Sequence, residues 1–540
     1  MAHIADGFIA QALQQPNQTA IVFSQAHQAR QTRSYREVLS AAERVAAIVS
    51  PFVTARQSDP NPVSGLNPSV QNTARIGLLL PNCPEFLEIF LGVTIAGGVA
   101  MVFDPKWTLA QVQQVIARSA PDLLFVEPEW ALQMEGLCEG LPMVRVPQLP
   151  QEESSGASGN ILWEQSSLKQ NSRVLLDHLA TVDDAPFYVG FTSGTTGSPK
   201  GVVRSHRSWV NSFAASCVEF GTCAADRILV PGFLTHSLSL YAALECLNAG
   251  ATLYLLPKFS LKAIVRLLTS HSITVLVAVP ALLKPIAKQV IHLSLTDSTL
   301  RAVIAGGSKL DLGLRSELPL AFPTAEILEY FGALELSFIS LATSREAVPP
   351  SSVGRSFYGV ELSVRQVAGG GEATTGEVGW VGVKSQMFSL GYLNQPNGEV
   401  ESGYRMVGDW ATVGDLGWQD AKGYLYLVGR EQDMILSGGM NIYPVEIETV
   451  LRQLPEVAEV AVVGVPDGDR GQAVCAAIQW VGEPLSQTEL FHRLRPHLAL
   501  AKCPRYFVAV DQFPKTSTGK IRRSVLQEQI IASLALPTKH

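Results

Sequence analysis

A short stretch of the chain, FTSGTTGSPKG at residues 191–201, combines glycines, hydroxyl side chains and a lysine. Backbone N–H groups that converge in a glycine-rich turn form a binding site for anions, and Gly194 and Gly197 permit a close approach of the backbone. Lys200 adds a mobile positive charge suited to a phosphate. The hydroxyl donors are Thr192, Ser193, Thr195 and Thr196. This stretch, called the phosphate loop below, therefore predicts a polyphosphate site.

The phosphate loop differs from the common nucleotide-binding P-loop, whose pattern is G-x-x-x-x-G-K-[ST]. Pro199 stands where the second glycine of that pattern is required, and Gly201 follows the lysine. The difference disfavours an ordinary NTPase. By its composition alone, the stretch is equally compatible with a flexible surface loop.

Five further motifs follow the phosphate loop along the chain. They are GGSKL (306–310), EYFGALE (329–335), VGDLG (413–417), YLVGREQDMILSGGMNIYPVEIE (426–448) and PKTSTGKIRR (514–523). In this order and at about this spacing, the set resembles the adenylate-forming superfamily of acyl-CoA synthetases, peptide-synthetase adenylation domains and beetle luciferases. The resemblance covers nearly the whole chain.

The resemblance implies an ATP site. It implies that Phe331 lies against the adenine, that Asp415 accepts hydrogen bonds from the ribose, and that Arg430 lies near the ribose and phosphate. Glu335 and Thr196 match the positions that hold Mg²⁺, for which carboxylate and phosphate oxygens are suitable ligands. The other implied nucleotide-binding positions are Gly306, Gly307, Ser308, Glu329, Tyr330 and Gly332.

Lys520 resembles the family's catalytic lysine for the first half-reaction, in which a carboxylate attacks the α-phosphate of ATP and pyrophosphate leaves. Two anions repel each other in that step, so a cation between them positions both and stabilises the developing charge. By itself a lysine in a basic tail is usually a surface residue. The surrounding motif favours the catalytic interpretation.

For the second half-reaction, the resemblance implies that Gly438 and Gly439 line the path of a thiol, and Lys258 is a candidate contact to a phosphate of coenzyme A. His236 stands where acyl- and aryl-activating members often carry a ring; the alternative is a core histidine that shapes a pocket wall. No acidic residue lies between Asp226 and Glu245. Members that activate α-amino acids place an aspartate nearby, so an acid without an α-amino group is favoured.

Two positions depart from the family pattern, and several functions stay open. Leu334 replaces a usual threonine, and Gln432 stands at the hinge where Asp or Lys is usual.

The leading hypothesis is an AMP-forming acyl-CoA synthetase for a fatty or aromatic acid, using ATP, Mg²⁺ and coenzyme A. Transfer to the phosphopantetheine of an acyl carrier protein, amino-acid adenylation, and a non-catalytic or luciferase-like protein are the alternatives. The identity and chain length of the acid, the acceptor, the oligomeric state and the pathway are not readable from the residues.

The elements that position these motifs predict an α/β fold. Short apolar runs such as RILVPG, ITVLVAVP, RAVIAGGS and AEILEYFG alternate with helical patterns, which indicates parallel or mixed sheets flanked by helices. The pattern changes near residue 430. We predict a large N-terminal adenylation domain over residues 1–430 and a smaller, mobile α+β lid domain over residues 431–540.

Composition sets the remaining expectations. The chain has 540 residues, of which 47% are hydrophobic and 16% charged, with a formal net charge of −7. These values favour folded domains and disfavour nucleic acid as a partner. The seven cysteines are odd in number and contain no CxxC pair, which predicts reduced thiols and no zinc site. The start lacks a signal-peptide pattern, and the apolar run at residues 89–103 is too short for a membrane span, so we expect a cytoplasmic protein.

Overall fold

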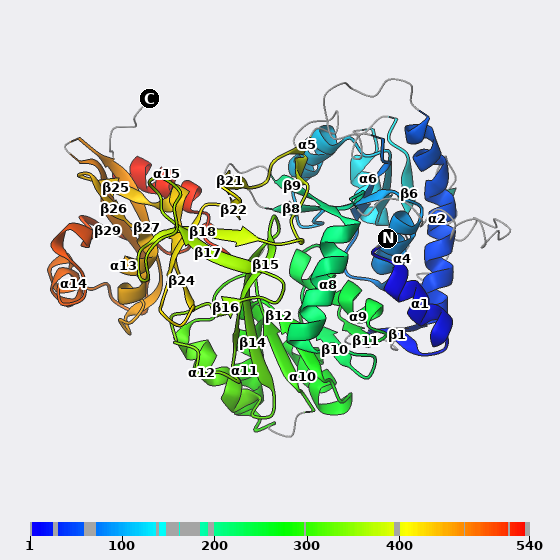
Figure 1. Ribbon diagram of the computed structural model, residues 1–540, viewed down its shortest axis with the longest axis horizontal. Coiled ribbons are helices and arrows are strands. Elements are labelled where there is room, and N and C mark those ends of the chain that lie inside the picture. Colours follow the sequence, from blue (N-terminus) through cyan, green and yellow to red (C-terminus); the bar gives the residue numbers. More distant parts are fainter. Residues whose placement is uncertain are drawn as a thin grey trace. The chain divides into compact units, whose positions relative to one another are not determined.

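The computed structural model describes residues 3–24, 31–58, 72–136, 140–146, 161–162, 184–192, 199–295, 299–393, 400–468, 470–516 and 519–534. The chain forms two compact units (Figure 1). The first contains residues up to Thr192, Pro199–Glu361 and Val383–Tyr404, and the second contains Leu362–Gly382 and the residues from Arg405 onward. The predicted boundary between a large domain over residues 1–430 and a smaller domain over residues 431–540 stays a prediction.

One mixed sheet of the first unit contains nine strands among the described residues, in the order β16-β15-β14-β13-β12-β10-β11-β1-β2. Its strands are β1 (Thr19–Phe23), β2 (Gln31–Ser34), β10 (Arg227–Val230), β11 (Thr252–Leu255), β12 (Val275–Ala278), β13 (Ala302–Ala305), β14 (Glu326–Ala333), β15 (Ser337–Thr343) and β16 (Arg355–Ser356). In the sheet, the six neighbouring strands β14, β13, β12, β10, β11 and β1 pair in parallel. Strand β2 at one edge and strands β15 and β16 at the other pair in antiparallel fashion. The mixed sheet and the apolar strands predicted from the sequence are confirmed.

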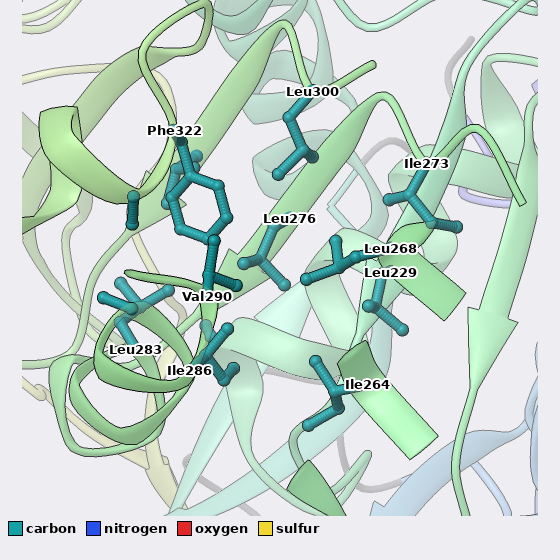
Figure 2. Packing of buried hydrophobic residues seen from close by; sticks show 14 of the residues in the cluster. Leu229, Ile264, Leu268, Ile273, Leu276, Leu283, Ile286, Val290, Leu300 and Phe322 are labelled. Carbon is teal, nitrogen blue, oxygen red and sulfur yellow. The ribbon is translucent and has the colours of Figure 1, made fainter. Parts of the chain in front are cut away.

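Helices cover this sheet: α8 (His206–Phe220), α9 (Ser237–Asn248), α10 (Leu261–Ser270), α11 (Pro280–His292) and α12 (Leu312–Ala321). Figure 2 shows the core that three of them share with the strands: Leu276 of the sheet lies among Ile264, Leu283 and Phe322. The apolar stripe of an amphipathic helix must be buried against another element. The alternation of strands and helices thereby builds a rigid base beneath the loops at the strand ends.

A second sheet of the first unit also has nine described strands, in the order β20-β19-β9-β8-β4-β3-β5-β6-β7. They are β3 (Arg75–Leu79), β4 (Val99–Val102), β5 (Leu123–Val126), β6 (Met143–Arg145), β7 (Ile161–Leu162), β8 (Pro186–Thr192), β9 (Lys200–Ser205), β19 (Gly391–Leu393) and β20 (Val400–Glu401). Its helices are α4 (Pro84–Ile95), α5 (Leu109–Ser119) and α6 (Pro128–Met134). The apolar run at residues 89–103 forms the end of α4 and then β4.

Near the N-terminus, α1 (Asp6–Gln14) and α2 (Tyr35–Gln57) enclose β1 and β2. Among the described residues, α2 is the one helix long and apolar enough to cross a membrane by length and composition. One face of α2, including Val38, Val45 and Val49, is buried, and Gly92 of α4 lies directly against Val45. This packing is typical of a core helix.

The second unit contains two smaller sheets. One consists of β17 (Glu361–Arg365), β18 (Gly379–Lys384), β21 (Arg405–Val407), β22 (Trp410–Thr412), β23 (Asp415–Gln419) and β24 (Leu425–Arg430). The other consists of β25 (Ile435–Ser437), β26 (Met440–Ile442), β27 (Val457–Asp467), β28 (Gly471–Trp480) and β29 (Tyr506–Ala509). Apolar residues of α13 (Pro444–Leu451) and α14 (Gln487–Leu494) are buried in one core of the latter sheet, and those of α15 (Arg523–Ser533) in another.

Candidate active site

The phosphate loop connects two strands that pair side by side. Thr192 is the last residue of β8 and lies opposite Lys200, the first residue of β9, in an antiparallel pair. The strands therefore hold both ends of the loop in register. The predicted loop residues Ser193, Gly194, Thr195, Thr196 and Gly197 lie outside the described residues.

Tyr392 connects the lysine of this loop to the predicted magnesium carboxylate. Its strand β19 pairs with β9, and the Nζ of Lys200 lies 5.4 Å from the centroid of the Tyr392 ring. The Tyr392 hydroxyl donates a hydrogen bond of 2.5 Å to Oε1 of Glu335. The cation predicted to bind phosphate and the carboxylate predicted to hold Mg²⁺ thus lie around one tyrosine ring. Sequence analysis missed Tyr392, because only the pairing of β19 with β9 brings it here.

Two loops predicted to flank the nucleotide lie next to each other at the carboxyl edge of the first sheet. β13 runs into Gly306, Gly307 and Ser308, and the parallel neighbour β14 runs through Tyr330 and Phe331. Ligands of open α/β sheets bind at this edge. A Cβ atom on Gly306 would lie 2.4 Å from Cζ of Tyr330, so the ring of Tyr330 occupies the space that only glycine leaves open.

Gly332 shapes the turn that presents Glu335. The pairing of β14 with β15 shifts register between Phe331 and Gly332, which marks a β-bulge. A Cβ on Gly332 would lie 2.4 Å from the carbonyl oxygen of Ser337, so the backbone approaches too closely for any other residue. The half-buried ring of Phe331 lies in this bulge.

The carboxylate of Glu329 is engaged inside the protein. Glu329 is buried, accepts a hydrogen bond of 2.7 Å from the backbone N–H of Leu310, and forms an ion pair with Arg315. These contacts hold the loop after β13 against β14. Glu329 therefore positions the candidate nucleotide loop, and a direct contact with the nucleotide stays a prediction.

Arg204, which sequence analysis missed, holds the segment that carries Glu335. Its side chain is 1% exposed, and its guanidinium donates to the carbonyl oxygens of Leu334 at 2.6 Å and Met387 at 2.7 Å. The backbone N–H of Ser389 donates to the carbonyl of Glu335 at 2.7 Å. Burial lowers the pKa of Arg204 to about 10, so the group stays charged at neutral pH. A lone arginine within the apolar strand KGVVRS was the available signal.

His236 lies at the start of α9 and is half-buried. Burial lowers its pKa, Asp104 opposes that shift and Lys106 adds to it, so the imidazole is neutral at neutral pH. Asn82 holds the loop before His236: its amide nitrogen donates to the carbonyl of Gly232 at 2.9 Å, and its oxygen accepts the N–H of Leu234 at 2.8 Å.

Lys258 is an exposed residue that follows β11. Its proposed contact with coenzyme A therefore remains a prediction.

In the second unit, the predicted ribose carboxylate and its basic neighbour lie together. Asp415 begins β23, Arg430 ends β24, and the two residues are partners in the antiparallel register. Nε of Arg430 lies 3.3 Å from Oδ1 of the buried Asp415. The pair therefore combines a hydrogen-bond acceptor with an exposed cation, as recognition of a ribose and a phosphate requires.

The residues after Arg430 form a short 3₁₀ turn, Glu431–Asp433. Arg405 pairs with Glu431 at 3.0 Å, and Arg523 lies 3.9 Å from Asp433. Ion pairs of the same unit therefore flank Gln432, the predicted hinge position. Gly438 and Gly439 form the exposed turn between β25 and β26.

Lys520 is exposed in a tight turn before α15. The N–H of Thr516 donates to the carbonyl of Lys520 at 2.8 Å, the N–H of Lys520 donates to the Thr516 hydroxyl at 3.1 Å, and Lys515 pairs with Ile521. Arg523 anchors the end of this turn through a 2.6 Å ion pair with the buried Glu448. The turn thus presents the lysine from a fixed base.

The part of the chain that the structure describes contains no group of three or more His, Cys, Asp or Glu residues able to hold a metal ion. These residues therefore do not indicate a metal site built from protein side chains alone. A single carboxylate, Glu335, fits Mg²⁺ that is held chiefly by substrate phosphates, because Mg²⁺ commonly binds one or two carboxylates together with phosphate oxygens and water.

Comparison with known proteins gives matches over most of the chain. The sequence profile described as AMP-binding enzyme matches residues 64–393, and the profile described as AMP-binding enzyme C-terminal domain matches residues 446–520. The uncharacterized acyl–CoA ligase YhfT of Bacillus subtilis is 34% identical over 86% of this chain and 90% of its own length. The fatty acid–[acyl-carrier-protein] ligase ScoC of Streptomyces coeruleorubidus is 30% identical over 84% of this chain and 86% of its own. The crystal structure of ATP-bound MatB from Rhodopseudomonas palustris is 25% identical, with a TM-score of 0.79 over 98% of this chain and 99% of that one.

Proposed function

Because the chain belongs to the family of AMP-binding enzymes, we propose how its residues divide the work of activating a carboxylic acid and transferring the acyl group. The protein is an AMP-forming acid–CoA ligase that uses ATP, Mg²⁺ and coenzyme A. The acid first displaces pyrophosphate from ATP to give an acyl-adenylate. The thiol of coenzyme A then displaces AMP and forms the thioester.

The first unit holds the triphosphate and the acid. The phosphate loop and Lys200 bind the phosphates, and Glu335 holds the Mg²⁺ that neutralises their charge. The loops at Gly306 and Phe331 flank the adenine. His236 is neutral and borders the acid, where it contributes a hydrogen-bonding ring without an added charge.

The second unit supplies the ribose contact through Asp415 and the catalytic cation through Lys520. We assign the lid to the residues after Arg430 and the hinge to the turn Glu431–Asp433, since a few loop positions suffice to absorb a domain rotation. In one orientation the lid brings Lys520 between the carboxylate and the α-phosphate. In the other, Gly438 and Gly439 leave room for the thiol.

The observation that carries this proposal is the arrangement around Tyr392. Its hydroxyl donates to Glu335 at 2.5 Å, and its ring lies 5.4 Å from the ammonium of Lys200. These two residues, 135 positions apart, come from the separate motifs assigned to phosphate and to metal. Their convergence supports a magnesium–triphosphate site.

Two further assignments go with the proposal. Coenzyme A is the acceptor, and the phosphopantetheine of an acyl carrier protein is the alternative, which the similarity to ScoC keeps open. We also place the enzyme in the cytoplasm, where ATP and coenzyme A are available. The packed face of α2 supports a location in water.

The test measures the exchange of labelled pyrophosphate into ATP with a panel of carboxylic acids, together with AMP release and thioester mass in the presence of coenzyme A. We expect exchange that depends on the acid. Lys520→Ala should abolish exchange and largely spare thioester formation from a supplied acyl-adenylate, because the cation serves only the first step.

The matched control is Lys515→Ala, which removes an exposed lysine of the same turn that pairs with Glu459 at 2.8 Å. It should leave exchange within about twofold of the parent protein, since surface ion pairs contribute little. Equal loss of both half-reactions in a folded Lys520→Ala protein would contradict the assigned role. Absence of exchange with every acid would contradict the proposed function.

A further inference from the structure

A continuous wall of aromatic rings lies between α8, α9 and the strands that lead to the candidate active site. Its members, called the aromatic wall below, are Trp209, Phe213, Phe220, Tyr241, Tyr330, Phe338 and Phe357. Neighbouring ring centroids are 4.3–6.3 Å apart. Rings at these distances are in contact.

Tyr330 belongs to both the aromatic wall and the site. Successive side chains of a strand point to opposite faces. Glu329 contacts Leu310 and Arg315, while Tyr330 contacts Phe338 and packs over Gly306. The ring of Tyr330 therefore lies directly behind the two loops assigned to the nucleotide.

Two residues of the aromatic wall are half-buried, and the other members are buried. The half-buried residues are Tyr241 and Tyr330, whereas Trp209 and Phe338 are 2% and 4% exposed. Tyr241 and Tyr330 both contact the ring of Phe338, at 5.2 Å and 4.9 Å. Tyr241 and Tyr330 are thus the least buried members of the wall, and both pack on one ring.

Hydrogen bonds fix the ring of Tyr241. The Tyr241 hydroxyl lies 2.9 Å from Oγ of Ser216. The Ser216 hydroxyl in turn donates a hydrogen bond of 2.5 Å to the buried carboxyl group of Glu245. Turning the ring aside would break this chain of hydrogen bonds inside the protein, where an unpaired polar group is costly. The wall is therefore stiff at Tyr241 as well as closely packed.

We propose that the enzyme activates a compact carboxylic acid, because Tyr330 and Tyr241 stop the acyl group before it can extend past α8 and α9. The inference rests on the proposed function and adds its substrate class: short aliphatic or single-ring acids are substrates, and long-chain fatty acids are excluded. One extra methylene that does not fit such a site lowers kcat/KM about tenfold or more.

The test compares kcat/KM for acetate, butyrate, hexanoate, decanoate, palmitate and benzoate, measured as acid-dependent AMP release with coenzyme A. The unmodified enzyme should prefer one of the smaller acids to palmitate by about a hundredfold or more. Tyr330→Ala should raise the ratio of decanoate to butyrate by about tenfold, because the ring no longer blocks the chain. Tyr330→Leu, a milder truncation that keeps an apolar side chain, should give a smaller increase.

The matched control is Tyr254→Ala, which removes a buried tyrosine from the core cluster shared with α10 and α11. It creates a cavity of similar size and should leave the ratio of decanoate to butyrate unchanged. Equal use of palmitate and butyrate by the unmodified enzyme would overturn the inference while leaving the ligase function intact. An unchanged ratio in active Tyr330→Ala and Tyr330→Leu proteins would also overturn it. Failure of all acids would instead overturn the proposed function.

Discussion

At the scale of single residues, the candidate site depends on buried polar groups as much as on the residues assigned to substrate. Within the described part of the chain, Arg204 forms no hydrogen bond to an assigned ligand-binding side chain, yet it joins the carbonyls of Leu334 and Met387. Glu335 follows the first of these carbonyls directly. Because both carbonyls remain when the arginine is removed, its loss leaves acceptors unsatisfied in the interior.

Arg204→Met, which keeps an unbranched apolar stem, should lower the free energy of unfolding by about 2–4 kcal/mol, since each orphaned carbonyl costs about 1–3 kcal/mol. It should also slow acid-dependent pyrophosphate exchange by about tenfold or more, because Glu335 loses its fixed position. Urea unfolding and the exchange assay measure the two effects.

The control for this residue is Arg207→Met. Arg207 is exposed and pairs with Asp184 on the surface at 2.6 Å, so its loss should change stability by less than about 1 kcal/mol. If both substitutions had the same small effect, the assigned role of Arg204 would be wrong.

At the scale of elements, the antiparallel pair of β14 and β15 is the part of the fold that delivers Phe331 and Glu335. Its bulge at Phe331 and Gly332 lets the chain turn where the backbone of Ser337 approaches most closely. The geometry of this pair, rather than any one side chain, sets the distance between the ring of Phe331, which we assign to the adenine, and the carboxylate.

Gly332→Ala should disturb this pair, because the new Cβ would lie 2.4 Å from the carbonyl oxygen of Ser337, a backbone atom that cannot turn away. We expect a loss of about 1–3 kcal/mol in the free energy of unfolding and a fall in exchange activity of about tenfold or more. Thermal unfolding and the exchange assay test this prediction.

Gly468→Ala serves as the comparison, since a Cβ there meets nothing within 4 Å. It should alter neither stability nor exchange measurably. Wild-type exchange activity in Gly332→Ala would show that the bulge does not position the site.

At the scale of the whole molecule, buried carboxyl groups make stability depend on pH. Burial raises the pKa of Glu245 to about 7, with the hydrogen bond from Ser216 and the charge of Arg301 opposing the shift. Below the unfolded pKa of 4.5, both states carry the proton. Between pH 4.5 and about pH 7, only the folded state keeps the proton on Glu245. The contribution of this group to the free energy of unfolding is therefore complete at low pH and is lost as the pH rises through 7.

Glu245→Gln removes this titration and keeps an acceptor for Ser216. Its free energy of unfolding should therefore decline less than that of the parent protein between about pH 5 and pH 8, with a difference of about 3 kcal/mol at most. Chemical denaturation across this pH range measures it. Glu129→Gln, at an exposed position of α6, should leave the parent profile unchanged. Parallel profiles for Glu245→Gln and the parent would contradict the prediction.

Local sequence determined the α/β fold and the apolar strands leading to Gly306 and Phe331, because strand periodicity and glycine turns act between near neighbours. The ordered motifs likewise determined the resemblance to the adenylate-forming superfamily and the candidate residues drawn from it. Tertiary structure alone decided that Tyr392 joins Lys200 to Glu335, that Arg204 holds the carbonyl before Glu335, and that Tyr241 and Tyr330 meet across Phe338. Each of these contacts joins segments far apart in the chain, and their register is set by sheet pairing and core packing, which no local pattern of residues records.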